Sequence, residues 1–411
     1  MAHDAYDVAI VGAGPAGTAS AIHLARGGQR VVVVDRSVFP RDKPCAEYLS
    51  PAAEPLLHAL GIMDALAAAQ PHRLRGFRIF APNGRVIQGD FAATHGPDGA
   101  SLYETGMVIP RLALDAVLLD AARRAGASVC EGWRLGQIEL RPDGYRLYPV
   151  GASDPIDARL LVAADGVHST VARRLGLQTF GALRKIGLVA HMRGIAGLGA
   201  YGEMHAANRR YVGIAPMESG ESGADDALCN VAMVVDERRD GRRLAGKPDA
   251  FLLDALSSFP GLRDRLSALR VERRTLAISR LNVIARRLSS ARLLLVGDAT
   301  GYYDPFTGEG IYAALRGAEL LASVALPALA RDDLSAAALS VYDERHRTAF
   351  HGKRLVEQII QLAVQTPPLL NHIARVIERR KFMADTMIAV TGDFLPASAV
   401  LRPGYLARLV I

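Results

Sequence analysis

The sequence predicts an α/β protein with a doubly wound, Rossmann-like domain that is discontinuous in sequence, an antiparallel β-sheet domain, and a helical C-terminal region. Three observations predict this class. Two buried-strand patterns flank a glycine-rich turn and a helix within residues 6–35. Alternating apolar and polar runs dominate residues 185–276, which is typical of an antiparallel sheet. The parallel-strand pattern returns at residues 292–296, so the first domain should recruit a strand from much later in the chain.

The N-terminal stretch carries the strongest local signal. A strand over 7–11, the turn Gly12-Ala13-Gly14-Pro15-Ala16-Gly17, a helix to residue 26 and a strand over 31–34 lead to Asp35 and Arg36. Gly12 permits a tight turn, Gly14 lets a pyrophosphate approach the backbone, and Gly17 lets helix and strand pack closely. Asp35 can accept hydrogen bonds from the ribose of an adenosine. The order predicts a dinucleotide site; a glycine-rich turn in another α/β domain is the alternative.

Length and composition set the remaining bounds. The 411 residues are 50% hydrophobic, which suits two or three domains with a large core. We expect no signal peptide and no membrane-spanning segment. Cys45, Cys130 and Cys229 have neither the number for a disulfide framework nor metal-ligand spacing, and this usage predicts a reducing, cytoplasmic setting without a metal site.

The formal net charge is +7, and arginine supplies most of the positive charge. Basic clusters occur at 242–243, 263–274, 286–287 and 375–381. They can be solvated helix faces, or they can attract an anionic partner such as a carrier protein, a carboxylated substrate or a lipid surface. No aromatic interleaving or nucleic-acid motif accompanies them, so we expect no nucleic-acid partner.

The remaining elements follow from periodicity and turn residues. Helices are expected over 51–69, 110–124, 248–258 and 311–326, a hairpin over 77–88, short antiparallel strands near 129, 137–140 and 145–148, and a buried strand over 160–164. Antiparallel strands are expected over 187–192, 210–214, 228–235 and 272–278, a polar loop over 218–226, and C-terminal helices broken at 367–368 and 392–402. The domains are therefore predicted as 1–75, 100–180 and 280–330 for the Rossmann-like domain, 76–99 and 181–279 for the substrate domain, and 331–411 for the helical region.

Three spaced motifs together resemble one family. They are the glycine turn, Ala164-Asp165-Gly166-x-His168-Ser169, and Gly297-Asp298-Ala299 followed by Asp304-Pro305-x-x-Gly308-x-Gly310. The set resembles the p-hydroxybenzoate hydroxylase superfamily of FAD enzymes, which includes aromatic monooxygenases, flavin-dependent halogenases and geranylgeranyl reductases. The resemblance covers most of residues 5–330.

The resemblance implies roles for these residues in FAD binding. Asp298 would accept from the ribityl hydroxyls, and the backbone at Gly308 and Gly310 would lie against the flavin. The helix from Ile311 would point its N-terminus at the flavin pyrimidine. Arg111 would contact FAD, with a surface arginine as the alternative; Asp165 would serve FAD and the nicotinamide cofactor, with a turn residue as the alternative. The other cofactor candidates are Pro15, Ala16, Cys45, Ala46, Gly166, Gly297 and Pro305.

Within the superfamily the reductase branch is the most similar. Lys43-Pro44-Cys45-Ala46-Glu47 resembles its K-P-C-G-G/E loop, and Tyr211-Val212-Gly213-Ile214-Ala215-Pro216 resembles its Y-x-W-x-F-P substrate motif. Gly213 and Ala215 replace two aromatic residues, which leaves room for a bulkier or differently shaped substrate. Cys45 can be a reactive thiol or a small packing residue. The halogenase motif W-x-W-x-I-P is excluded because Trp133 is the only tryptophan, and no lysine lies between Lys43 and Lys185.

These features favour an FAD-dependent, NAD(P)H-dependent monooxygenase that acts on an aromatic or polyketide-like hydrophobic substrate through a flavin C4a-hydroperoxide. The alternative is a flavin-dependent reductase of carbon–carbon double bonds, and a non-enzymatic flavin-binding module is a distant third. Nicotinamide would bind transiently, since no second complete glycine fingerprint is present. The substrate, possibly carrier-bound, would meet Tyr211, Gly213 and Ala215, which share one strand face. No catalytic residue can be assigned.

Overall fold

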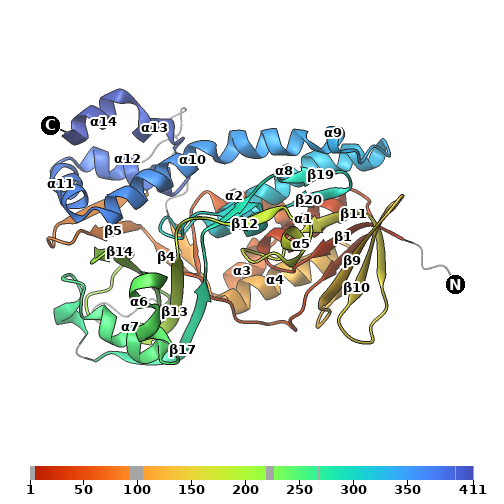
Figure 1. The fold of residues 1–411 in the computed structure, drawn as a ribbon. Coiled ribbons are helices and arrows are strands. Elements are labelled where there is room, and N and C mark those ends of the chain that lie inside the picture. The colour runs from red at the N-terminus through yellow and green to blue at the C-terminus, as the bar shows by residue number, and fades with distance from the viewer. Residues whose placement is uncertain (1–4, 92–104, 219–225, 267, 394, 411) are drawn as a thin grey trace.

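The computed structural model describes residues 5–91, 105–218, 226–266, 268–393 and 395–410 (Figure 1). Residues 92–104, where the predicted second and third segments of the domain layout meet, lie outside this range. Most of the polar loop predicted over 218–226 lies outside it as well.

The Rossmann-like sheet confirms the discontinuous α/β architecture. Its strand order is β19-β20-β11-β1-β2-β8, and β11, β1, β2, β8 and β20 run parallel. The bounds are Tyr6–Val11 for β1, Val31–Val34 for β2, Ser128–Cys130 for β8, Ile156–Ala163 for β11, Ser289–Ser290 for β19 and Leu293–Leu295 for β20. Leu161 of β11 pairs with Leu293 of β20, so the late strand completes the early sheet. The expectation that the strand near residue 129 is antiparallel is wrong, because β8 pairs parallel with β2.

Helices cover one face of this sheet. They are α1 (Pro15–Arg26), α4 (Arg111–Arg124) and α8 (Gly310–Ala330), which share a core with β1, β2 and β11. The opposite face is covered by α5 (Thr170–Arg174) and the hairpin of β9 (Leu135–Arg141) and β10 (Gly144–Pro149), with Trp133 buried between them. The helix predicted over 51–69 is divided into α2 (Ala53–Leu60) and α3 (Met63–Ala68), because Gly61 adopts a left-handed φ of 68°.

Helix α8 bears on the expectation that the chain has no membrane-spanning segment. Within the part of the chain that the structure describes, it is the one helix long and apolar enough to cross a membrane by length and composition. It packs against α1 and α2, and 61% of its most apolar window is buried. Its apolarity is therefore accounted for by its place in the protein core.

The second sheet has the order β17-β13-β16-β15-β14-β5-β6 and is antiparallel except where β14 meets β5. Its strands are β5 (Gly76–Phe80), β6 (Val86–Asp90), β13 (Lys185–Arg193), β14 (Tyr201–Ala207), β15 (Arg210–Pro216), β16 (Cys229–Asp236) and β17 (Arg270–Ser279). Strand β14 and helix α6 (Glu237–Leu244) were not predicted. Helices α6 and α7 (Pro248–Leu256) pack on the face of the sheet that carries Val212 and Ile214, which leaves the Tyr211 face free for the cavity.

Small elements join the two large sheets. One three-stranded sheet contains β3 (Tyr48–Leu49), β4 (His72–Leu74) and β7 (Gly106–Val108), and another contains β12 (Gln178–Phe180), β18 (Val283–Ala285) and β21 (Gly301–Tyr302). Short 3-10 helices occur as η1 (Arg263–Arg265) and η2 (Gly297–Thr300). Element η2 follows β20 directly, so it brings the second glycine motif to the carboxyl edge of the parallel sheet.

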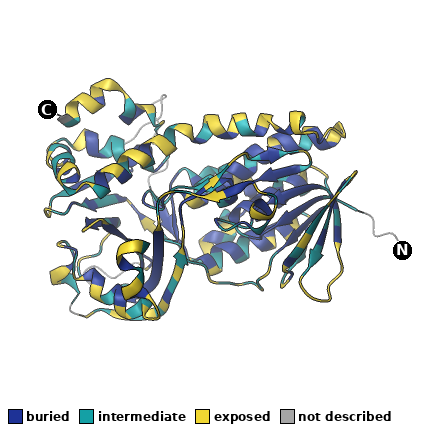
Figure 2. Ribbon diagram, in the orientation of Figure 1, coloured by how far each residue is buried: buried dark blue, intermediate teal, exposed yellow. Residues whose placement is uncertain are grey.

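The C-terminal helices cap the second sheet. They are α9 (Ala336–Leu339), α10 (Val341–Gln365), α11 (Pro367–Glu378), α12 (Lys381–Thr391), α13 (Ser398–Leu401) and α14 (Pro403–Val410). Figure 1 shows α10 running the length of the molecule, with α11 to α14 gathered at its end beside β5. The break between α10 and α11 falls at the predicted Pro367-Pro368. Figure 2 shows that these helices alternate buried and exposed faces, as expected for a layer with one side in solvent.

Candidate functional site

One cavity of about 310 Å³ lies where the two large sheets and the C-terminal helices meet. The predicted site residues that line it are Gly14, Pro15, Ala16, Cys45, Ala46, Arg111, Gly166, Gly297, Asp298, Pro305, Gly308, Gly310, Ile311, Tyr211, Gly213 and Ala215. Gly12, Gly17, Asp35, Arg36 and Asp165 do not line it. The fold thus brings together motifs that are separated by up to almost 300 residues in sequence.

The glycine turn is packed too closely for side chains. Gly12 has φ of 107°, and a Cβ there would lie 2.4 Å from the carbonyl oxygen of Ala164. A Cβ on Gly17 would lie 1.8 Å from the carbonyl oxygen of Gly12. Helix α1 therefore starts directly against the carboxyl ends of β1 and β11. Its first turn contains no acidic residue, so its N–H groups and positive dipole end are available to an anion.

Two guanidinium groups lie beside this helix start. A Cβ built on Gly14 would be 3.6 Å from Nη2 of Arg41 and 3.9 Å from Nη2 of Arg111. Arg111 donates two hydrogen bonds of 2.7 Å to the carboxylate of Asp115, and Arg41 lies 3.1 Å from the same carboxylate. Arg111 is buried, which removes the surface-arginine alternative. Burial opposes the charged form, but Asp115 outweighs it and the pKa of Arg111 is raised. The pair and the helix start fit a pyrophosphate.

Asp35 is oriented at the end of β2. Its Oδ2 accepts a hydrogen bond of 2.8 Å from the backbone N–H of Ala13, and its Oδ1 accepts one of 2.8 Å from the N–H of Ser37. These bonds fix the carboxylate beside the glycine turn, where the ribose of an adenosine would lie. Arg36 is exposed and lies away from the cavity wall.

The second glycine motif places a carboxylate on the cavity wall. Asp298 in η2 is half-buried, and its side-chain carboxylate accepts no hydrogen bond from the described residues. Its charge attracts the ammonium of Lys43. Burial and the charge of Arg111 lower the pKa of Lys43, whereas Asp298 opposes this shift. A free carboxylate with a cation nearby suits hydroxyl donors such as a ribityl chain.

Asp165 has one occupied and one free oxygen. Its Oδ2 accepts hydrogen bonds from the N–H groups of Thr170 at 2.6 Å and Val171 at 3.2 Å, which caps α5. Its Oδ1 is buried and has no partner in the described chain. Burial raises the pKa of this carboxyl. The turn-residue alternative is therefore incomplete, because a buried oxygen without a partner fits a hydrogen-bond donor from a ligand.

The loop that contains Cys45 is fastened to the second sheet through Glu47. Glu47 is fully buried with φ of 58°, and it accepts hydrogen bonds from the backbone N–H of Arg111 at 2.9 Å, from Asn230 at 2.9 Å and from His191 at 2.7 Å. The side-chain amide of Asn230 also donates a hydrogen bond of 2.9 Å to the backbone carbonyl of Cys45. Burial raises the pKa of Glu47, but these donors outweigh it and the pKa is lowered. Sequence reasoning missed this junction, since neither the left-handed backbone nor the partners are visible in a short motif.

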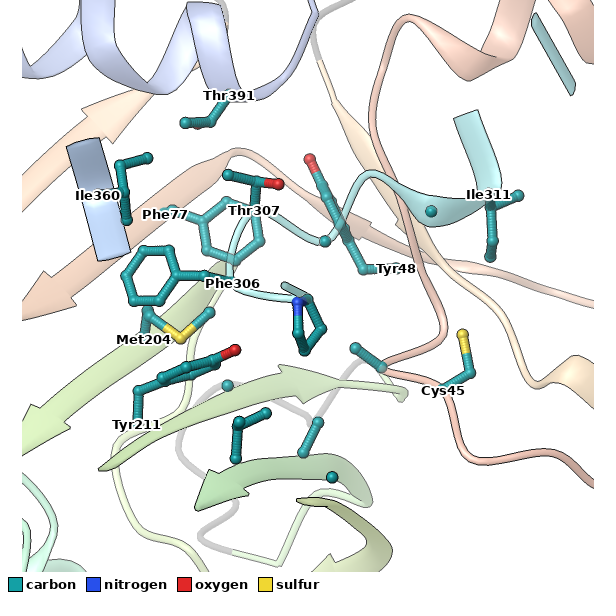
Figure 3. A pocket seen from close by; sticks show the side chains of 18 of the residues that line it. Cys45, Tyr48, Phe77, Met204, Tyr211, Phe306, Thr307, Ile311, Ile360 and Thr391 are labelled. Atoms are coloured by element: carbon teal, nitrogen blue, oxygen red, sulfur yellow. The ribbon is translucent and has the colours of Figure 1, made fainter. Parts of the chain in front are cut away.

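The predicted substrate face is formed by β15. Tyr211, Gly213 and Ala215 line the cavity, whereas Val212 packs with α7 on the other side of the sheet. The register of β15 with β14 and β16 is regular through Gly213, so this glycine does not mark a bulge. Figure 3 shows Tyr211 and Met204 at one end of the cavity with Phe306 above them, and Cys45 and Ile311 at the other. A Cβ on Gly213 would meet Cε of Met204 at 3.4 Å, an ordinary contact.

A buried polar network closes the cavity beside this face. The carboxylate of Asp304 accepts three hydrogen bonds, each of 2.5 Å. Oδ1 accepts from the phenol of Tyr211 and from the side-chain amide of Gln361 on α10, and Oδ2 accepts from the ammonium of Lys185. Burial and the Asp304 charge hold the pKa of Tyr211 well above its usual value, so its phenol stays neutral. Lys185 and Gln361 were not predicted. Their partners lie more than 100 and 50 residues away in sequence, and no local pattern joins them.

Beyond this network the cavity is almost wholly apolar. It continues between the C-terminal helices, where its lining includes Ile360, Ala363, Ile373, Met387, Leu401 and Leu409. Figure 3 shows Ile360 and Thr391 on this side, opposite the end that holds Cys45. The site therefore has a polar, cationic half suited to a dinucleotide and an apolar half suited to a long or bulky hydrophobic ligand.

Comparisons with known proteins agree with this geometry. A family model described as FAD binding domain matches residues 5–358. "Conditioned medium factor receptor 1" of Dictyostelium discoideum is 29% identical, over 97% of this chain and 79% of that protein. "Digeranylgeranylglycerophospholipid reductase 1" of Methanothermobacter thermautotrophicus is 30% identical, over 82% of this chain and 81% of that protein. "Menaquinone reductase" of Mycolicibacterium smegmatis is 28% identical, over 95% and 92%.

Solved structures share the fold. A flavoprotein/dehydrogenase from Cytophaga hutchinsonii superposes with a TM-score of 0.81 at 18% identity, over 98% of this chain and 96% of that chain. Halogenase PltM in complex with phloroglucinol and FAD gives a TM-score of 0.76 at 17% identity, over 98% and 85%. The match of the family model over most of the chain decides the assignment. The chain belongs to the FAD binding domain family and is a flavoprotein of the p-hydroxybenzoate hydroxylase and geranylgeranyl reductase superfamily of FAD-dependent oxidoreductases.

Proposed function

We propose that this protein is an FAD-dependent reductase of carbon–carbon double bonds in long isoprenoid chains. One observation carries the proposal: the cavity passes from the flavin cradle at Gly308 and Gly310 into an apolar space between β15 and helices α10 to α14. A flexible polyunsaturated chain fits a long apolar space better than a compact aromatic ring does. The names of the archaeal and mycobacterial relatives, a digeranylgeranylglycerophospholipid reductase and a menaquinone reductase, support the same substrate class.

Double-bond reduction was the alternative function in the sequence analysis, where a monooxygenase was favoured. From the sequence, the small residues at Gly213 and Ala215, in place of two aromatic residues, were expected to leave room for a bulkier or differently shaped substrate. In the fold, aromatic side chains from elsewhere replace them: Phe306 lies 5.0 Å from Tyr211, and Phe77 lies 4.9 Å from Tyr48, between ring centroids. The cavity wall thus carries aromatic side chains, although different residues supply them.

The chain's own residues bind, orient and exclude water. FAD, when bound here and reduced, would supply the hydride, and a proton from solvent would complete the saturation of the double bond. Gly213 and Ala215 leave space for the chain, while Tyr211 and Phe306 form an aromatic wall on one side of it. The apolar lining keeps water from the reacting carbons. NAD(P)H is the proposed reductant of the flavin, and the hydrophobic substrate is free or carrier-bound.

The experiment that tests the proposal uses purified holoprotein reduced with dithionite under anaerobic conditions. Geranylgeraniol is added, and the product mass is measured. A gain of two hydrogens for each saturated double bond is the expected result. The absence of any such gain with native flavin content would overturn the proposal. Repeating the assay with NADH and NADPH identifies the reductant.

Monooxygenation is a second candidate because the aromatic side chains of Tyr48, Phe77, Tyr211 and Phe306 line the cavity. Such a wall can stack an aromatic substrate. An oxygen-dependent product that has gained one oxygen atom, with no anaerobic reduction, would favour this candidate. Failure of the reduced flavin to react with any substrate in either assay would leave only a flavin-binding module.

A further inference from the structure

The apolar half of the cavity reaches the molecular surface between α10 and α14. Ile359 on α10 and Leu406 on α14 both line the cavity, yet they are 39% and 38% exposed. A residue that is on the cavity wall and in solvent marks an opening. This opening lies in the part of the cavity that the C-terminal helices line.

The opening has an apolar rim. Leu355 and Leu362 flank Ile359 at helical spacing, so the three share one face of α10, and Leu362 is 60% exposed. Leu369 at the start of α11 is also exposed. Large aliphatic side chains gathered at one place on a surface indicate an interaction site rather than ordinary exposure. We call Leu355, Ile359, Leu362, Leu369 and Leu406 the rim.

The charge around the rim is of one sign. The sequence contains no acidic residue over 358–377 or 394–411. Exposed arginines stand in the same stretches: Arg375 on α11, and Arg402 and Arg408 beside and on α14. Three acids flank these stretches: Glu378 pairs with Arg85, Asp393 pairs with Lys353, and Glu357 is half-buried. An aliphatic surface with positive flanks is complementary to an anionic lipid bilayer.

We propose that the rim docks on an anionic lipid bilayer, so that a membrane-dissolved isoprenoid chain enters the cavity between α10 and α14. The leucines would enter the interfacial region, and the arginines would meet the lipid phosphates. The purpose of this docking rests on the proposed function, but the docking itself can be measured without turnover. An acidic carrier protein would meet the arginines equally well, but it would leave the exposed leucines without a hydrocarbon partner.

The experiment is co-sedimentation of the FAD-loaded protein with vesicles of phosphatidylcholine containing about 30% phosphatidylglycerol, and with phosphatidylcholine alone. Binding to the anionic vesicles that weakens in high salt is the expected result. The double variant Leu362→Glu/Leu369→Glu should reduce this binding roughly tenfold or more, because two charges would enter the interface. Neither leucine lines the cavity.

The control is Leu140→Glu, which places one charge at a 67% exposed leucine on β9, in the other half of the molecule. It should bind vesicles as the native protein does. A second variant, Arg402→Glu/Arg408→Glu, tests the electrostatic part without altering the leucines. Flavin content and melting temperature on each preparation identify a variant that fails to fold.

Three outcomes overturn the docking proposal. They are no binding of the native protein to anionic vesicles, a loss of binding in Leu140→Glu equal to that in Leu362→Glu/Leu369→Glu, or full binding by both the leucine and the arginine double variants. Reduction of geranylgeraniol dispersed in detergent separates this result from the proposed function. Rim variants should retain that reduction while losing activity on a vesicle-embedded chain. Vesicle binding without any reduction would refute the proposed function and leave the docking surface standing.

Discussion

The phenol of Tyr211 on β15 donates a hydrogen bond of 2.5 Å to the carboxylate of Asp304 in the loop that carries Gly308 and Gly310. Both groups are buried, and the carboxylate also accepts hydrogen bonds from Lys185 and Gln361. This bond ties the second sheet to the loop before α8 and, through Gln361, to helix α10, which also lines the cavity.

Replacing Tyr211 by Phe should therefore destabilise the protein without removing the cofactor. The buried Asp304 oxygen would lose a donor, which costs about 1–3 kcal/mol of unfolding free energy. Tyr145→Phe is the matched control, since its hydroxyl lies 3.5 Å from the carbonyl of Ala291 and makes at best a weak bond. The urea midpoint and the flavin content check both variants. A urea midpoint of Tyr211→Phe equal to that of the native protein would show that the Tyr211 hydrogen bond adds no stability.

Replacing Asp298 by Ala should weaken FAD binding. The carboxylate lines the cavity without a partner among the described residues, so its loss removes a ligand contact rather than a fold contact. A hydrogen bond to a charged group contributes ~1.5–3 kcal/mol, which corresponds to roughly ten- to a hundredfold in the Kd for FAD. Titration of the apoprotein with FAD, followed by flavin fluorescence, measures this Kd. Asp264→Ala, at an exposed aspartate, is the control. Unchanged affinity would refute the ribityl role.

Replacing Gly213 by Trp should fill the cavity and abolish turnover of a long or bulky substrate while flavin content stays native. Gly213→Ala is the matched control, because its Cβ meets Met204 at an ordinary 3.4 Å. Melting temperature, flavin content and turnover are measured on one preparation. Native turnover in a folded, fully loaded Gly213→Trp protein would show that this face is not the substrate site.

Glu357 on α10 should make stability depend on pH. Burial, and to a lesser degree the charge of Asp304, raise its pKa from 4.5 to about 7 against the opposing effect of Lys353. A carboxyl with a raised pKa favours the fold in its neutral form, so its contribution is complete below pH 4.5 and is lost as pH rises through about 7.

Glu357→Gln cannot ionise and should gain melting temperature over the native protein as pH is raised from about 5 to 8, by an amount equivalent to roughly 1–3 kcal/mol. The control is Glu344→Gln, an exposed carboxyl on the same helix. A difference between Glu357→Gln and native that is constant with pH would contradict the assignment.

The cofactor half of the site was readable from the sequence because its determinants are local. The turn from Gly12 to Gly17 needs only its own strand and helix, and the order strand, turn, helix, strand, acid fixes where Asp35 lies. The motif at Gly297 and Asp298 ends a strand whose apolar run marks it as parallel. In each case a short segment specifies its own backbone and the chemistry that the backbone presents.

The tertiary structure alone decided the apolar half of the cavity. The apolar space between α10 and α14, and its rim at Ile359 and Leu406, arise because amphipathic helices from the last 70 residues fold back over β15. Glu47 accepts hydrogen bonds from His191 and Asn230 only because distant segments pack together. The same holds for Asp304, which accepts from Lys185 and Gln361. Helical and strand periodicity predict which face of an element is buried, but not which element will cover it. That choice depends on the packing of the whole chain.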